Sequence, residues 1–130
     1  MTNYLEVYTH KFVVTSKVYN GFLTAFQDRN PIHVDVEQAK ALGFPSVVMH
    51  GNILNGFLSY FVGECLPNKK VMIISQQIDF HKPVFLEDEL TLTAKIDQIS
   101  SAVQMISFKF VFRNQQNKKV AKGVISIKEI

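Results

Sequence analysis

Two side chains that can move protons, Asp28 and His33, lie five positions apart in the sequence. Pro31 lies between them. It has no amide hydrogen and pushes the preceding residue, Asn30, towards extended geometry, so a helix cannot continue through this segment. The resulting turn is expected to present both side chains to one small volume, with Asn30 bonding to the backbone of the turn. A carboxylate and an imidazole that share a water molecule can divide the work of general acid and base. Which residue takes which role stays open, because such a pair titrates as a unit.

The pair His50 and Gly51 is the second candidate feature, because it opens an apolar segment that is expected to form a helix. Backbone amides in the first turn of a helix lack intrahelical partners and can stabilise negative charge that develops on a substrate oxygen. The Gly51 amide is therefore a candidate oxyanion donor. His50 is expected to pack or bond beside the helix start rather than to act chemically. The four histidines are scattered without further ligands at metal-binding spacing, so no metal is expected.

The segments around these residues have the patterns of helices. Ser16 is suited to cap a helix whose apolar face repeats at three- and four-residue spacing, at Val18, Phe22, Ala25 and Phe26. Asp35 is suited to cap a short helix that runs through Leu42, with Ala39 and Leu42 facing inward. The segment after the His-Gly pair has apolar residues over a wide arc, which favours a central helix enclosed by other structure: Ile53, Leu54, Phe57, Leu58, Phe61 and Val62.

From Val71 onward the apolar residues alternate, as they do in strands that bury one face. Four such runs follow, and three of them have clear faces: Ile74, Ile78 and Phe80; Leu90, Leu92, Ala94 and Ile96; and Ile106, Phe108, Phe110 and Phe112. The segment from Tyr4 to Val14 is expected to be extended at a sheet edge. We therefore predict an α+β fold in which an antiparallel sheet of about five or six strands, joined by short turns, wraps around the central helix. The free edges of such a sheet favour a homodimer or a homo-oligomer of dimers.

The composition limits the classes of function. A chain of 130 residues fits one domain, residues 1–130, and a formal net charge of +3 is too small and dispersed for a nucleic-acid surface. The longest uncharged stretch, 41–63, is interrupted by Pro45, and its densest apolar part is about half the roughly 20 residues that a membrane span needs. The single cysteine, Cys65, excludes an internal disulfide, and no secretory signal is visible, so a cytoplasmic location is expected.

The spacing of these residues resembles that of the MaoC-like dehydratases, the family of (R)-specific enoyl-CoA hydratases. The family pattern is similar to F-x-x-x-S/T-G-D-x-N-P-x-H-x-D, followed by an alanine, a glycine-rich turn and a His-Gly pair. The positions of this sequence in register with it are Asp28, Asn30, Pro31, His33, Asp35, Ala39, Gly43, His50 and Gly51. A later segment, from Phe80 to Leu90, looks like the family's F-x-x-P-V-x-x-G-D-x-L. The resemblance implies the hot-dog fold, an antiparallel sheet around a long central helix with short accessory helices.

The resemblance also implies an activity, the interconversion of trans-2-enoyl thioesters and (R)-3-hydroxyacyl thioesters by addition or removal of water. Asp28 and His33 would be the catalytic pair, and the Gly51 amide the oxyanion donor. The residues that support the turn and shape the site would be Asn30, Pro31, His50, Phe26 and Gln27. The thioester would be carried by coenzyme A or by an acyl carrier protein. No separate cofactor is expected, because coenzyme A or phosphopantetheine is part of the substrate.

Two departures from the family pattern bear on the substrate. Phe26 and Gln27 replace a small residue and a glycine, and Glu87 replaces a glycine before Asp88. Phe26 and Gln27 are expected to narrow or reshape the acyl pocket. Two alternatives stay open, a hot-dog acyl thioesterase and a non-catalytic module that binds acyl thioesters. Thioesterases of this fold generally lack the Asp-x-Asn-Pro-x-His turn, which counts against the first.

Overall fold

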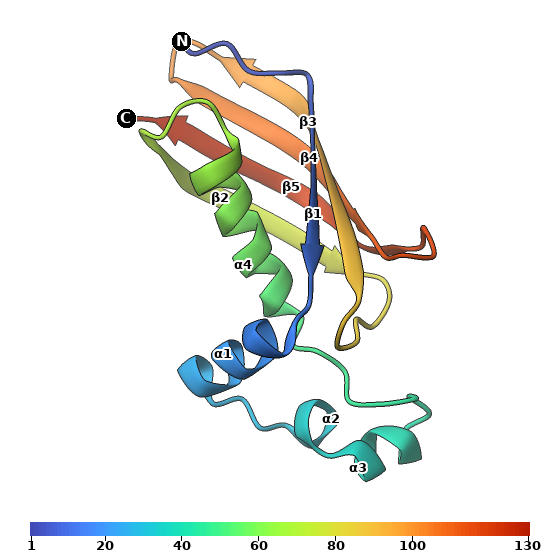
Figure 1. Cartoon of the computed structure of the whole chain (residues 1–130). Coiled ribbons are helices and arrows are strands. Elements are labelled where there is room, and N and C mark those ends of the chain that lie inside the picture. The colour runs from blue at the N-terminus through green and yellow to red at the C-terminus, as the bar shows by residue number, and fades with distance from the viewer.

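The computed structural model describes residues 1–130, which form one sheet and a set of helices (Figure 1). The strands are β1 (Val7–Val13), β2 (Val71–Phe80), β3 (Glu89–Ser100), β4 (Met105–Arg113) and β5 (Lys119–Glu129). The helices are α1 (Ser16–Phe26), α2 (Pro31–Val34), α3 (Val36–Ala41), α4 (Asn52–Tyr60) and a π-helical turn, η1 (Phe61–Cys65), that continues α4. Helix α4 lies along the sheet, whereas α1, α2 and α3 gather beyond one end of it. The predicted site residues, which lie between positions 26 and 51, are therefore placed at this end.

The five strands lie in the order β1-β3-β4-β5-β2, and every neighbouring pair is antiparallel. This confirms the antiparallel sheet and the place of the N-terminal strand at an edge. The expectation that short turns join all four later strands is wrong between β2 and β3, because residues 81–88 carry the chain across the sheet and β2 pairs with β5 instead. Pro83 lies in this connection and cannot donate to a strand ladder, so β2 does not continue into a hairpin. The two free edges are β1 and β2.

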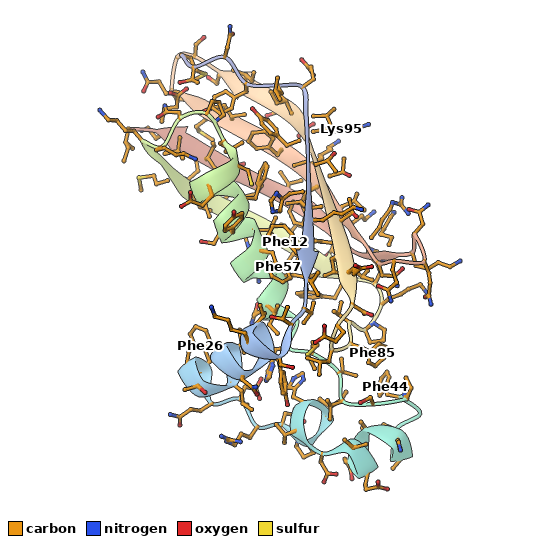
Figure 2. All side chains as sticks on the ribbon, viewed as in Figure 1. Phe12, Phe26, Phe44, Phe57, Phe85 and Lys95 are labelled. Carbon is orange, nitrogen blue, oxygen red and sulfur yellow. The ribbon has the colours of Figure 1, made fainter.

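The core lies between α4 and the inner face of the sheet. The alternating residues of β3 and β4 are buried as predicted: Leu90, Leu92, Ala94, Ile106, Phe108, Phe110 and Phe112. Phe12 of β1 stacks on Phe57 of α4, with ring centroids 4.4 Å apart and an angle of 15° between the rings (Figure 2). This contact joins the first strand to the central helix, so the hydrophobic cluster is continuous from β1 through α4.

Helix α4 is less enclosed than the sequence predicted. The sheet covers the face that carries Ile53, Leu54, Phe57 and Leu58, all of which are buried. The other face is exposed, and its residues are small or polar: Asn52, Gly56, Ser59 and Tyr60. The amphipathic pattern is therefore that of a helix packed on one side. None of the helices combines the length and the apolar character that crossing a membrane requires.

Strand β2 is the least buried strand of the sheet. Its alternation predicts one buried face, but Ile74 and Phe80 are 40% and 53% exposed, and only Ile78 of that face is half-buried. A bulge between Ile73 and Ser75 interrupts the alternation, and β5 is the only strand beside β2. Apolar side chains therefore remain uncovered along this edge.

Two local predictions about the helices are wrong by one position. Thr15, not Ser16, caps α1: Thr15 has extended backbone angles and its side chain accepts a hydrogen bond from the Val18 amide over 3.2 Å. Leu42 is 57% exposed rather than inward-facing, because α3 ends at Ala41 and the chain leaves the helical register there. The predicted cap at Asp35 is confirmed, since its carboxylate accepts from the amides of Glu37 and Gln38.

Both departures from the family's glycines lie where the backbone is left-handed. Gln27 has φ 58° and Glu87 has φ 69°, values that glycine adopts without a steric penalty and other residues adopt at a cost of about 1 kcal/mol or more.

Glu87→Gly is therefore expected to raise the free energy of unfolding by roughly 1 kcal/mol, measured by urea denaturation. The matched control is Glu89→Gly in β3, where a glycine in a strand is expected to lower stability by about 0.5–1 kcal/mol. A loss of stability in Glu87→Gly would contradict the argument from strain.

Candidate active site

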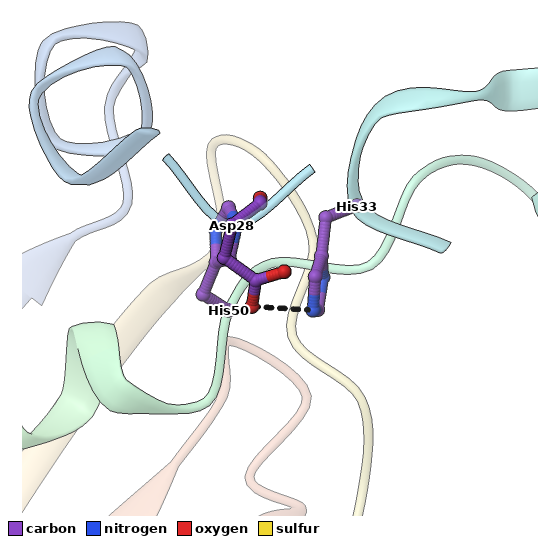
Figure 3. Close-up of side chains that lie close together, drawn as sticks. All are labelled: Asp28, His33 and His50. Atoms are coloured by element: carbon purple, nitrogen blue, oxygen red, sulfur yellow. Dashed lines mark hydrogen bonds and ion pairs between the residues drawn. The ribbon is translucent and has the colours of Figure 1, made fainter. Parts of the chain in front are cut away.

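Asp28 and His33 face one another in the folded chain, with 3.8 Å between Asp28 Oδ2 and His33 Nε2 (Figure 3). The turn that joins them is held by two local hydrogen bonds: the Asn30 amide donates to Asp28 Oδ1, and the Ile32 amide donates to Asn30 Oδ1. Asn30 thus caps α2, and Pro31 begins that helix at a position where its missing amide hydrogen costs nothing. The chain is non-helical only up to Asn30, so His33 projects from a short helix rather than from an extended turn.

The hydrogen bond made by His33 Nδ1 determines whether His33 Nε2, the nitrogen that faces Asp28, can accept a proton. His33 Nδ1 lies 2.7 Å from the carbonyl oxygen of Val48, which can only accept, so Nδ1 carries the hydrogen. In the neutral ring Nε2 then has a free lone pair directed at Asp28. The backbone of His33 is also fixed, because the Tyr19 hydroxyl donates to its carbonyl oxygen over 2.6 Å. Val48 and Tyr19 lie far from His33 in sequence, and sequence reasoning missed both.

Between these two groups, one water molecule can be oriented for attack. The Asp28 carboxylate and His33 Nε2 are both acceptors, so a water between them would donate one hydrogen to each and present a lone pair to a third atom. The side chain of Asp28 is 50% exposed and that of His33 is 16% exposed, which leaves the pair open to an incoming substrate on the Asp28 side. The arrangement is suited to general acid–base chemistry on water.

His50 is a buried residue that contacts both ends of the turn. It is 2% exposed, its Nε2 donates to the backbone carbonyl of Asp28 over 2.8 Å, and its ring stacks on His33 with centroids 4.1 Å apart. These contacts fix Asp28 and His33 against the start of α4, in keeping with the packing and bonding expected for His50. Asp28, His33 and His50 each offer a ligand atom within 4.8 Å of the others. His50 Nε2 donates to the Asp28 carbonyl, whereas the buried His50 Nδ1 has no hydrogen-bond partner. The expectation of a site without a metal stays a prediction.

Gly51 occupies the residue position just before α4, with helical backbone angles of −57° and −35°. No carbonyl or side chain of the protein accepts a hydrogen bond from its amide, so this donor is free. A β-carbon at this position would lie 3.0 Å from Cε1 of Phe80, so the glycine allows the Phe80 ring to close over the helix start. Gly51 and His33 line the same cavity, and the role of the Gly51 amide as an oxyanion donor stays a prediction.

Each residue of the pair lines a different cavity. The smaller, of about 330 Å³, has His33, Gly51, Phe80 and Lys82 among its lining residues. The larger, of about 1180 Å³, is a groove between α1 and α4 that reaches Asp28. A ligand that touches Asp28, His33 and Gly51 at once must therefore extend from one cavity towards the other.

The residues of the groove were largely missed by sequence reasoning. Phe22 was assigned only to the apolar face of a helix, and Asn52, Asn55 and Tyr60 received no role in the site, although all four line the groove. For Asn52, Asn55 and Tyr60 the common signal is the polar and small side of α4, which the helical periodicity does show, whereas Phe22 lies on α1. His81 received no role in the site either, although it lines the smaller cavity.

Phe26 lies at the end of α1 and forms part of the groove wall. Its side chain is 70% exposed and packs on Phe22, with ring centroids 4.8 Å apart. Gln27 follows in the left-handed conformation that ends α1. The groove keeps its volume of about 1180 Å³ with Phe26 in place, so this ring shapes the wall without closing the groove.

Comparison with known proteins assigns this architecture to a family. A family model described as "MaoC like domain" matches residues 6–124. The chain belongs to the MaoC-like domain family. Its fold is the hot-dog fold of the (R)-hydratase from A. caviae, whose structure aligns with a TM-score of 0.88 and 21% identity over 99% of this chain and 98% of that one.

Curated relatives of this MaoC-like chain include enzymes of thioester metabolism. The chain is 32% identical over 76 residues to the (R)-specific enoyl-CoA hydratase of Aeromonas caviae, covering 58% of this chain and 57% of the relative. It is 27% identical over 78 residues to the mitochondrial 3-hydroxyacyl-[acyl-carrier-protein] dehydratase of Arabidopsis thaliana, covering 60% and 46%. The matched segments thus span about half the length of these relatives.

Proteins of this fold also form complexes. The ChsH1-ChsH2 complex from Mycobacterium tuberculosis contains a chain that aligns with a TM-score of 0.84 and 18% identity, over 100% of both chains.

Proposed function

We propose that this MaoC-like chain is an (R)-specific hydratase or dehydratase that interconverts trans-2-enoyl thioesters and (R)-3-hydroxyacyl thioesters. The observation that carries the proposal is the approach of Asp28 Oδ2 and His33 Nε2 to 3.8 Å, with His33 Nδ1 committed to the Val48 carbonyl. Two proton acceptors aimed at one volume are what the addition of water to an electron-poor double bond requires. The activities named for the Aeromonas and Arabidopsis relatives support this choice of reaction.

The hydration step uses each group in turn. The bound water loses a proton to the Asp28–His33 pair as its oxygen bonds to C3 of the enoyl group. The electron pair of the C2–C3 double bond moves towards the thioester, and negative charge builds on the thioester oxygen. The free Gly51 amide would donate to that oxygen, an interaction worth roughly 3 kcal/mol where single donors have been removed from other enzymes. The pair then returns a proton to C2, and dehydration is the reverse sequence.

The two cavities suggest how the substrate lies. Because Gly51 lines the smaller cavity, the thioester oxygen and the start of the carrier arm would lie there, beside Lys82. Because Asp28 lines the groove between α1 and α4, the acyl chain would extend from C3 into that groove. The carrier would be coenzyme A or an acyl carrier protein.

The proposal includes a homodimer, or a homo-oligomer of dimers, in the cytoplasm. The support for the homodimer is the free edge at β2, whose apolar side chains are uncovered: Met72, Ile73, Ile74 and Phe80. An exposed apolar edge strand is a ready template for pairing with another chain. The single free cysteine, Cys65, is compatible with a reducing compartment.

The test is an assay of the purified protein with trans-2-enoyl thioesters of several lengths on coenzyme A and on an acyl carrier protein. Hydration is expected to remove the absorbance of the conjugated enoyl group without releasing free thiol, and chiral analysis is expected to find the (R)-3-hydroxyacyl product. Release of thiol would indicate a thioesterase instead. Binding without turnover on every substrate would indicate a non-catalytic module, and either result would reject the proposal.

A further inference from the structure

Three amide side chains form a hydrogen-bonded row beside the groove. Asn55 Nδ2 donates to Asn52 Oδ1 over 2.6 Å, and Gln76 Nε2 of β2 donates to Asn55 Oδ1. Asn52 and Asn55 are three residues apart on α4, so they lie one above the other on the same face, and both line the groove. Asn52 Nδ2 has no acceptor within the chain and ends the row as a free donor. The central helix thus presents ordered amide groups to the space in which the acyl chain would lie.

The two walls of the groove differ in polarity. Val18, Phe22 and Phe26 of α1 form an apolar wall with Lys17 beside them, whereas the α4 wall places Asn52 and Asn55 among apolar residues: Ile53, Phe57 and Tyr60. A plain aliphatic chain would pack on the α1 wall but would cover the amides without replacing their hydrogen bonds to water, at about 1–3 kcal/mol for each group left unsatisfied. An acyl chain with an oxygen at the right depth would satisfy the amides and still use the apolar wall.

We propose that the Asn52–Asn55–Gln76 row makes this site selective for acyl chains that carry a hydrogen-bonding oxygen beyond C3, over plain aliphatic chains of the same size. This inference rests on the proposed hydratase function and names its substrate class. Sites built to hydrogen-bond a substrate group discriminate strongly against analogues that lack it. Asn52 is exposed and Asn55 is half-buried, so water reaches these amides and the expected discrimination is smaller than in a closed pocket, roughly tenfold in kcat/KM.

The experiment compares two substrates of equal size on the full-length protein. These are the coenzyme A thioesters of 6-hydroxy-trans-2-hexenoate and trans-2-heptenoate, in which a hydroxyl group replaces a methyl group. The wild type is expected to have a kcat/KM about tenfold higher for the hydroxylated substrate. In Asn55→Leu this ratio is expected to fall to one or below, because the row is broken and the wall becomes apolar. Gln76→Leu is expected to lower the ratio in the same direction, because the Asn55 amide loses the donor that orients it.

The matched control is Gln77→Leu. Gln77 is the neighbouring amide residue of β2, lines neither the groove nor the smaller cavity, and makes no side-chain hydrogen bond. It is expected to keep the wild-type ratio. A wild-type ratio of one, or a ratio unchanged in Asn55→Leu, would overturn the inference while leaving the hydratase function in place. Failure of the wild type to hydrate either acyl chain or the trans-2-butenoyl group, on coenzyme A and on an acyl carrier protein alike, would instead overturn both. If Asn55→Leu does not fold, Asn55→Ala supplies the same comparison.

Discussion

Asp28→Asn is expected to lower kcat for hydration of a trans-2-enoyl thioester by about 10³-fold, with little change in KM. The amide nitrogen cannot accept a proton, so a water beside His33 would lose its second acceptor. The turn should survive, because the asparagine oxygen can still accept from the Asn30 amide and the backbone carbonyl of residue 28 still accepts from His50. The measurement is a steady-state assay of enoyl absorbance with wild type and variant at equal concentrations.

The control for this variant is Asp35→Asn, in the same segment of the chain. Asparagine is as good a helix cap as aspartate, and Asp35 caps α3 without touching the site, so activity is expected to stay near that of wild type. His33→Ala is expected to cause a loss as large as that of Asp28→Asn, because the two residues act on the same water. If either Asp28→Asn or His33→Ala retained near-normal hydration rates, the assignment of the catalytic pair would be wrong.

Gly123→Ala is expected to be the most destabilising single methyl addition in the chain, lowering the free energy of unfolding by more than about 3 kcal/mol. Gly123 lies on β5 opposite Ile78 of β2 and Phe110 of β4. A β-carbon there would lie 1.8 Å from the backbone carbonyl oxygen of Gln77 and 2.8 Å from Cζ of Phe110. The carbonyl belongs to the neighbouring strand and cannot rotate away, so β2 would have to separate from β5.

Urea denaturation of Gly123→Ala and of a matched glycine variant tests this expectation. Gly21→Ala is the control, because no heavy atom lies within 4 Å of the added carbon and alanine favours the interior of α1. It is expected to raise the free energy of unfolding by about 0.5–1 kcal/mol. A loss below about 1 kcal/mol in Gly123→Ala would show that β2 can shift without cost to the sheet.

The fold was predictable where the pattern is local and repeated. The alternation in β3 and β4 and the apolar arc of α4 identify strands and a helix, because burial of one face imposes a period of two or about 3.6. The path between β2 and β3 was not predictable in this way, because periodicity identifies a strand without naming its neighbour. The exposure of β2 was missed for the same reason, since an edge position follows from the pairing of β2 with β5.

The sequence by itself identified the residues of the turn and of the helix start at the site. Pro31 and Asn30 set the turn, Asp28 and His33 stand on either side of it, and Gly51 precedes an apolar helix; each of these follows from residue type and short-range spacing. The tertiary structure alone decided how they are aimed. The Val48 carbonyl fixes the hydrogen of His33 on Nδ1 and leaves Nε2 facing Asp28, and His50 bonds to the Asp28 carbonyl. The packing of α1 beside α4 leaves the groove that Asn52 and Asn55 line. The reason is that a turn depends on the backbone preferences of neighbouring residues, whereas a tautomer, a stacked ring and a cavity depend on atoms brought together from distant parts of the chain.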